Sequence, residues 1–131
     1  MFGFFKRKEK EPEKEIAVLP PEVVEKLQSE IEQLHQEILT TQDNNKLAEL
    51  FEQVGLKLFD LNEKDQAIEN LEKSLANKQS IGDGYKKLMS LYNEKRAEAA
   101  RAGNDQGIDY YMGKMDDMRQ IAKKVTITGN N

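Results

Sequence analysis

Few residues in this 131-residue sequence have types and spacing that suit catalysis or metal binding. His35 is the single histidine and there is no cysteine, so the usual histidine and thiolate ligand sets for zinc are missing. Gly82 and Gly84 are not followed by the Lys-Ser or Lys-Thr pair of a phosphate-binding loop. Asp116 and Asp117 are neighbours in sequence and would point to different faces of a helix, so they do not form a carboxylate pair. We therefore expect no enzymatic activity, no cofactor and no metal.

The N-terminal segment has a chemistry of a different kind. Residues 1–10 combine three phenylalanines with four basic residues and one glutamate, a net charge of +3. The residues concerned are Phe2, Phe4, Phe5, Lys6, Arg7, Lys8 and Lys10. Phenyl rings partition into the headgroup boundary and cations are attracted to anionic lipid, so this tail is expected to hold the chain at a membrane surface. Two alternatives stay open: a frayed end whose phenylalanines pack on the body, and a motif that docks to a partner.

Composition sets the broad class of protein. The length suits one domain, and 34% charged residues with 7% aromatics suit a thin helical core. The net charge of −4 makes nucleic acid an unlikely partner, because a basic field over the whole domain is missing. No run of about 18 apolar residues exists, so no membrane-spanning helix is expected. Together with the lack of cysteine, these features favour a cytoplasmic protein, peripheral at the inner membrane face if the tail binds there.

Apolar residues recur three and four positions apart through most of the chain, which is the period of an amphipathic helix. The expected helices cover residues 21–40, 46–61, 63–79, 80–102 and 105–124. The connections are only a few residues long, so consecutive helices should pack antiparallel. The predicted fold class is all-α, with antiparallel helical hairpins stacked in a short array of about five helices.

Several residues mark the expected ends of these helices. Pro21 suits a first helical position, and Asn62 is expected to cap the third helix. Ser80 and Asp83 have the spacing of a capping box, and Gly103 is placed to end the fourth helix. The expected organisation is a tail and linker over 1–19, a helical domain over 20–125 and a disordered C-terminal tail over 126–131. Residues 125–128, at the border of the last two, have side chains that favour an extended strand.

The sequence also repeats itself. Phe51, Val54 and Leu58 recur 34 positions later as Tyr85, Leu88 and Tyr92. The offset then becomes 40, because residues 65–68 (Asp-Gln-Ala-Ile) correspond to residues 105–108 (Asp-Gln-Gly-Ile). The second copy is therefore expected to hold six extra residues within the fourth helix.

At these positions the chain resembles the tetratricopeptide repeat (TPR) family, over residues 48–124. Phe51, Val54-Gly55 and Leu58 correspond to the family's first helix, while Ala67 and Leu71 correspond to the small and large positions of its second. The sequence departs from the family pattern at Gln79, where a proline is usual, and at Met89, where a small residue is usual. The resemblance implies stacked hairpins that bind a peptide or protein segment in a groove lined by the first helix of each hairpin.

The groove that this resemblance implies is acidic and apolar on the second expected helix. Its candidate residues are Glu49, Glu52, Gln53, Leu56, Phe59 and Asp60 there, and Lys86, Ser90, Asn93 and Ala97 on the fourth helix. The family's carboxylate-binding members carry Lys and Asn where this chain has Glu52 and Leu56, so a basic or apolar segment is the expected partner. The simpler interpretation is that these residues form solvated helix faces.

Two other functions remain open. The apolar stripe of residues 21–40, or the methionines Met112, Met115 and Met118, suit a homo-oligomer, and hence a self-assembling helical subunit. The basic residues of the tail and of the fourth helix suit a nucleic-acid accessory protein, against which the acidic body argues. The leading hypothesis is a non-enzymatic interaction adaptor.

Overall fold

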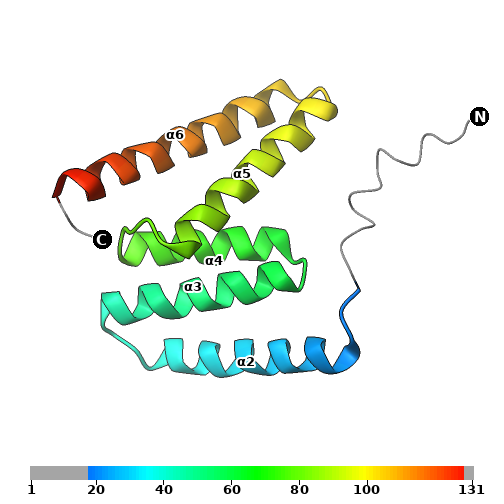
Figure 1. The fold of residues 1–131 in the computed structure, drawn as a ribbon, viewed down its shortest axis with the longest axis vertical. Helices are drawn as coiled ribbons and strands as arrows, with labels where there is room; N and C mark the ends of the chain where they lie inside the picture. Colours follow the sequence, from blue (N-terminus) through cyan, green and yellow to red (C-terminus); the bar gives the residue numbers. More distant parts are fainter. Residues whose placement is uncertain (1–17, 129–131) are drawn as a thin grey trace, which may run out of the picture.

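The computed structural model describes residues 18–128, which form five α-helices joined by short turns (Figure 1). Their bounds are α2 Pro21–Leu39, α3 Asn44–Asp60, α4 Lys64–Asn77, α5 Asp83–Arg101 and α6 Asp105–Thr128. The described part of the chain contains no strand, so the predicted all-α fold class is confirmed. The expected tail residues 2–10 and the last residues, 129–131, lie outside the described range.

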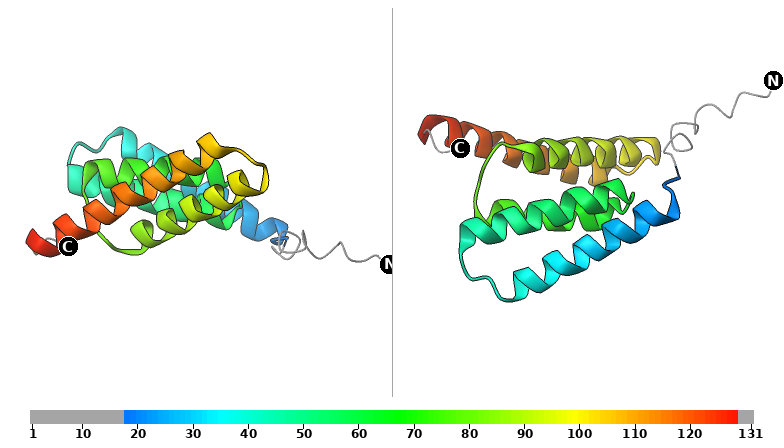
Figure 2. Two further views of the ribbon diagram at one scale, coloured as in Figure 1. Left: turned by 90° about the horizontal axis from the view of Figure 1, so that it is seen from above. Right: turned by 60° about the horizontal axis from the view of Figure 1, so that its bottom comes forward.

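Figure 1 shows α2, α3 and α4 lying one above another, with α5 rising obliquely from the end of α4 and α6 running back above α5 and diverging from it. Further views show the α5–α6 pair stacked on the α3–α4 pair (Figure 2). Of the described helices, only α3 lies close to α2. The Lys57 ammonium of α3 also pairs with the Glu30 carboxylate of α2 at 3.1 Å. The first helix thus covers one side of α3.

The core is built from the apolar stripes that the helical period predicts. Leu50, Val54 and Leu71 are almost completely buried at the α3–α4 contact. Leu91, which no predicted stripe includes, is buried equally deeply. The remaining members of the same cluster are Ile31, Leu34, Leu58, Ala67, Leu75, Leu88, Tyr92 and Met118. Burial of these side chains is the main stabilising term for a fold of this size.

A close approach of α3 to α4 depends on small residues. A Cβ on Gly55 would lie 2.7 Å from Leu71 Cδ2 and 3.3 Å from the Ala67 carbonyl oxygen, so only glycine fits there without a shift. In the second hairpin, a Cβ on Gly107 would lie 3.0 Å from Ala99 Cβ. Each hairpin therefore has a tight crossing, but the second one pairs Gly107 with Ala99 rather than with the region of Met89.

Both hairpins end their first helix in the same way. Within residues 18–128, left-handed backbone angles occur at Asn62, with φ 63°, and Gly103, with φ 69°. Glu63 N–H donates to Leu58 O at 2.9 Å, and Asn104 N–H donates to Ala99 O at 2.8 Å, the bond of a Schellman motif. Gly103 therefore ends α5 as predicted. Asn62 does not cap α4; it is the matching turn residue after α3.

These matched turns correct the repeat. Leu58 corresponds to Ala99, Asn62 to Gly103 and Glu63 to Asn104, each 41 positions apart. At this turn the offset is 41 rather than the predicted 40, although α5, with 19 residues, is only two residues longer than α3, with 17. Along α6 the predicted offset of 40 holds, because Tyr111 and Met115 pack against the core as Leu71 and Leu75 do. Asn104 also caps α6, since its side-chain oxygen accepts the Gly107 N–H at 3.0 Å.

Two other predicted helix ends are wrong. No capping box forms at Ser80, because α5 begins at Asp83 after Gly82, which supplies no side-chain bond. At the other end, α6 continues to Thr128, so residues 125–128 are helical rather than extended, and 126–128 of the expected C-terminal tail belong to the helix. Val125 is buried in this last stretch, which gives the added turn an apolar contact.

Candidate functional site

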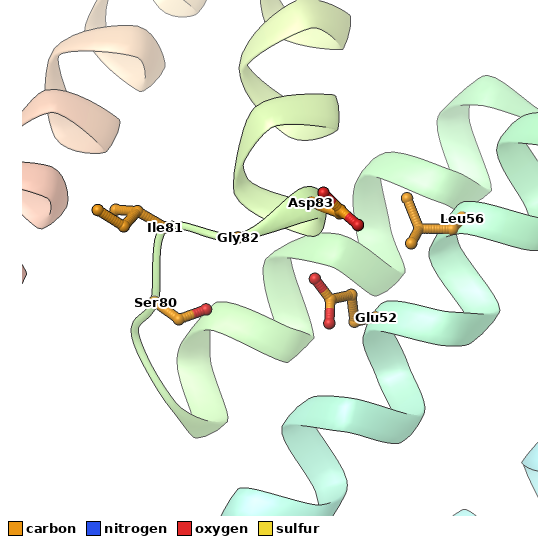
Figure 3. A pocket seen from close by; sticks show the side chains of 6 residues that line it. All are labelled: Glu52, Leu56, Ser80, Ile81, Gly82 and Asp83. Carbon is orange, nitrogen blue, oxygen red and sulfur yellow. The ribbon is translucent and has the colours of Figure 1, made fainter. Parts of the chain in front are cut away.

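A hollow of about 530 Å³ lies between α3 and the start of α5 (Figure 3). We call it the α3–α5 hollow, and its lining residues are Glu52, Leu56, Ser80, Ile81, Gly82 and Asp83. Glu52 and Leu56 come from the predicted groove. The other four belong to the α4–α5 connection and the first residue of α5, which the sequence did not suggest as site residues.

Glu52 has a structural task at the edge of this hollow. Its Oε2 atom accepts the Gly84 N–H at 2.6 Å. The first amides of a helix have no partner within the helix, and a carboxylate at that end also interacts favourably with the helix dipole. Gly84 permits this approach, because a Cβ there would lie 2.7 Å from the same oxygen. The N-terminus of α5 is therefore capped by a side chain of α3, 32 residues earlier in the sequence.

The predicted groove residues of α3 divide into two groups. Glu52, Leu56 and Phe59 are half-buried on the side that faces α5. Lys87 of α5 places its ammonium 3.9 Å from the centroid of the Phe59 ring, a close cation–π contact. The rest, Glu49, Gln53 and Asp60, are exposed and form an open strip beside the hollow.

The predicted residues of α5 are not brought to the hollow. Lys86, Ser90 and Asn93 are exposed, Ala97 is half-buried, and none of the four lines it. Asn93 instead accepts hydrogen bonds from the Arg96 guanidinium on the next turn of the same helix, at 3.2 Å and 3.0 Å. The side of α5 that meets α3 carries Gly84 and Lys87.

The charges around the hollow are mainly negative. Glu52 and Asp83 line it, and Glu49 and Asp60 stand on the adjoining strip. Two cations lie among these residues: Lys87 lies over Phe59, and Lys46 Nζ is 4.0 Å from Glu49 Oε1 at the end of the strip. The apolar part is provided by Leu56 and Ile81. An arrangement of this kind favours a ligand that brings positive charge or apolar surface, and it disfavours a free carboxylate.

Other chemistry is sparse in the described part of the chain. Within residues 18–128, no three side chains among His, Asp and Glu come together in a way that would hold a metal ion. No described helix combines the length and the hydropathy needed to cross a membrane. His35 is exposed on α2, and Asp116 pairs with Arg119 at 2.6 Å on the surface of α6.

Comparison with known proteins identifies no relative of this chain. No protein-family model, no curated protein and no solved structure matches the chain. The resemblance to TPR proteins therefore rests on the residues of the repeat alone.

Proposed function

We propose that this chain is a non-enzymatic adaptor that binds a segment of a partner polypeptide along α3. The α3–α5 hollow carries this proposal, because it lies beside an exposed strip of the same helix and joins residues of both hairpins. Ligand sites are typically concave, with apolar walls and a few polar groups. Here Leu56 and Ile81 provide the apolar walls, and Glu52 and Asp83 provide the polar groups.

The chemistry of the hollow favours a basic and apolar segment. A partner lysine or arginine would meet the carboxylates of Glu49, Asp60 and Asp83, and an apolar side chain would contact Leu56. Glu52 contributes charge but is already bound to the Gly84 amide, so it acts at the edge of the site rather than as a free ligand. An acidic or C-terminal carboxylate partner is not part of the proposal.

The likeness to TPR proteins supports the same function. Two helical hairpins follow one another, and each crosses tightly at small residues, Gly55 with Ala67 and Gly107 with Ala99. In that family, the first helix of each hairpin faces the bound segment, and here α3 would be the first such helix. The departures at Met89 and in the length of α5 mean that the second hairpin would contribute differently, through Gly84 and Lys87.

The experiment is a pull-down from the native cell extract with the full chain as bait. Leu56→Arg places a cation and a longer side chain in the hollow and is expected to remove the captured partner. Gln66→Arg on α4 is the matched control, because it adds the same side chain at an exposed position away from the hollow. Equal capture by both variants, with unchanged circular dichroism, would exclude binding in the hollow.

We further propose that the N-terminal tail holds the adaptor at the inner face of a membrane in the cytoplasm. The proposal rests on the sequence of residues 1–10, with Phe2, Phe4 and Phe5 next to a basic cluster. Co-sedimentation with anionic vesicles is expected to pellet the full chain and to fail for a chain that lacks residues 1–15. Equal pelleting of the two chains would refute it.

Self-association is the second candidate function, and one observation favours it. Tyr110 and Met112 are 57% and 50% exposed on α6, and Ile127 is 75% exposed near its end. Met112 and Ile127 lie within about 60° of each other around the axis of α6, so a second copy packed along this side of the helix would cover both. Static light scattering decides this point: a monomer at tens of micromolar removes the hypothesis, and a dimer lost in Met112→Glu supports it.

A further inference from the structure

A second cavity, of about 210 Å³, opens between α4 and α6 with α5 behind it. We call it the α4–α6 cleft. It shares no lining residue with the α3–α5 hollow, so binding in the cleft does not depend on the proposed adaptor site. On α4 its lining extends from Glu72 past the end of the helix to Gln79, and on α6 it extends from Lys114 to Ile121. Each stretch spans eight residues, and on α6 the seven steps between its ends are about 10 Å of helix.

One end of the cleft is closed by a polar bridge. The Glu72 carboxylate accepts a short hydrogen bond from the Tyr92 hydroxyl and lies 3.5 Å from Lys114 Nζ. Lys114 also stands over the rings of Tyr92 and Tyr110, at 5.9 Å and 5.6 Å from their centroids. The charges of Glu72 and Lys114 therefore compensate each other, and neither is left over for a ligand.

The walls beyond this bridge are apolar. Leu75, Leu88 and Met118 line the cleft and are buried, and Leu88 is only 1% exposed. Ile121 forms part of the wall toward the C-terminal end of α6 and is half-buried. A straight aliphatic chain can lie against these side chains without displacing any of them, because the cavity is already open.

Asp117 is the one lining group whose charge remains uncompensated. Its side chain is exposed, and among residues 18–128 it makes no hydrogen bond or ion pair. It stands on α6 between Lys114, which is bound to Glu72, and Ile121 of the apolar wall. With Glu72 and Lys114 cancelling, the lining carries one net negative charge, beside a surface suited to methylene groups.

We propose that the α4–α6 cleft binds one lysine or arginine side chain of a partner polypeptide, with the aliphatic stem against Met118 and Ile121 and the cationic group at Asp117. A cavity of about 210 Å³ is many times the roughly 10–15 Å³ that one water needs on the same measure, so it has room for one extended side chain. A carboxylate occupant would be repelled by Asp117, and a neutral apolar occupant would leave it unpaired.

The test uses blocked amino acids and the full chain. Acetyl-arginine and acetyl-lysine N-methylamides are titrated against protein labelled at its methionine and isoleucine methyl groups, with acetyl-norleucine N-methylamide as a neutral probe of similar stem. The basic probes are expected to shift the Met118 and Ile121 signals and to bind about two- to fivefold more tightly than norleucine, the range of one exposed ion pair. The Met118 and Ile121 signals report on the cleft alone, because the α3–α5 hollow, which is also proposed to bind basic side chains, is lined by a different isoleucine, Ile81.

Variants assign the effect to the carboxylate. Asp117→Asn keeps the shape of the cleft and is expected to remove the preference for the basic probes. Asp109→Asn is the matched control, an exposed aspartate on the same helix that does not line the cleft, and it should retain the preference. Three results would overturn the proposal: no shift at Met118 or Ile121 with tens of millimolar probe, equal binding of norleucine, or a preference that persists in Asp117→Asn.

Discussion

Removal of the Glu52 carboxylate tests whether α3 stabilises the start of α5. In Glu52→Ala, the partly buried Gly84 amide loses its acceptor, and Gly82 supplies no side chain to replace it. A hydrogen bond to a charged group contributes about 1.5–3 kcal/mol when buried. Glu52 is only half-buried, so water replaces part of this bond, and we expect a loss of about 1–2 kcal/mol in the free energy of unfolding. Glu49→Ala, one turn earlier and exposed, should cost at most about 0.5 kcal/mol.

The same geometry predicts a change of sign at Gly84. In the natural chain, Gly84→Ala puts a Cβ within 2.7 Å of Glu52 Oε2 and 2.8 Å of its Cγ, so the glutamate must swing away and its bond is lost. In Glu52→Ala this obstacle is gone, and alanine gains up to about 1 kcal/mol over glycine from helix propensity. Gly84→Ala should therefore be neutral or destabilising alone, and stabilising in the Glu52→Ala background.

Urea denaturation of the four chains of this double-mutant cycle measures the coupling. We expect an interaction free energy of about 1–2 kcal/mol, since the two residues are in direct contact. Additive effects of the two substitutions, within about 0.3 kcal/mol, would refute the capping of α5 by Glu52. Equal losses in Glu52→Ala and Glu49→Ala would do the same.

Two further predictions concern the core. Burial, with the adjacent Glu72 carboxylate, holds the pKa of Tyr92 above its ordinary value near 10, so the native protein keeps this proton longer than the unfolded chain does. Stability should be complete below about pH 10 and fall above it, and Tyr92→Phe should flatten the fall in urea denaturations at about pH 9–11; an equally steep fall would contradict this. Gly55→Ala drives a Cβ into Leu71 and should destabilise by about 1–3 kcal/mol. Gly113→Ala, which meets open space in α6, should stabilise by up to about 1 kcal/mol, and equal thermal midpoints for both would contradict the crossing at Gly55.

The helices and most of the core could be predicted because their signal is local. A stripe such as Leu50, Val54 and Leu58 depends only on the period of the helix, and the structure buries all three. Leu91 shows the limit of periodicity: it lies three residues after Leu88, outside the predicted stripe of α5, and is buried in the same core cluster. Periodicity identifies the apolar face of a helix, but the width of the buried face depends on how many neighbouring helices pack against it.

The start of α5 could not be predicted, because its stabilising partner is distant in sequence. Ser80 and Asp83 have the spacing of a capping box, and local rules favour it. The structure instead uses Glu52, which packing brings to Gly84. The same tertiary contact changes which residues form the candidate site. Residues 80–83 line the α3–α5 hollow although the sequence did not suggest them, whereas the predicted Lys86, Ser90 and Asn93 are exposed on α5 and do not line it.

The turn between α5 and α6 lies one residue later than the predicted offset of 40 places it, while the buried residues of α6 keep that offset. The short match of residues 65–68 to 105–108 favours six extra residues, and six residues turn a helix by about 600°, which leaves the following side chains about 120° from their original face. Seven residues turn it by about 700°, within about 20° of two complete turns. Tyr92 and Ala99 are seven apart and both are buried, so the same face of α5 continues into contact with α6. Seven added residues therefore keep the buried face of α5 in phase up to the turn, and the one-residue difference is taken up before the core-facing residues of α6, which remain 40 positions from those of α4.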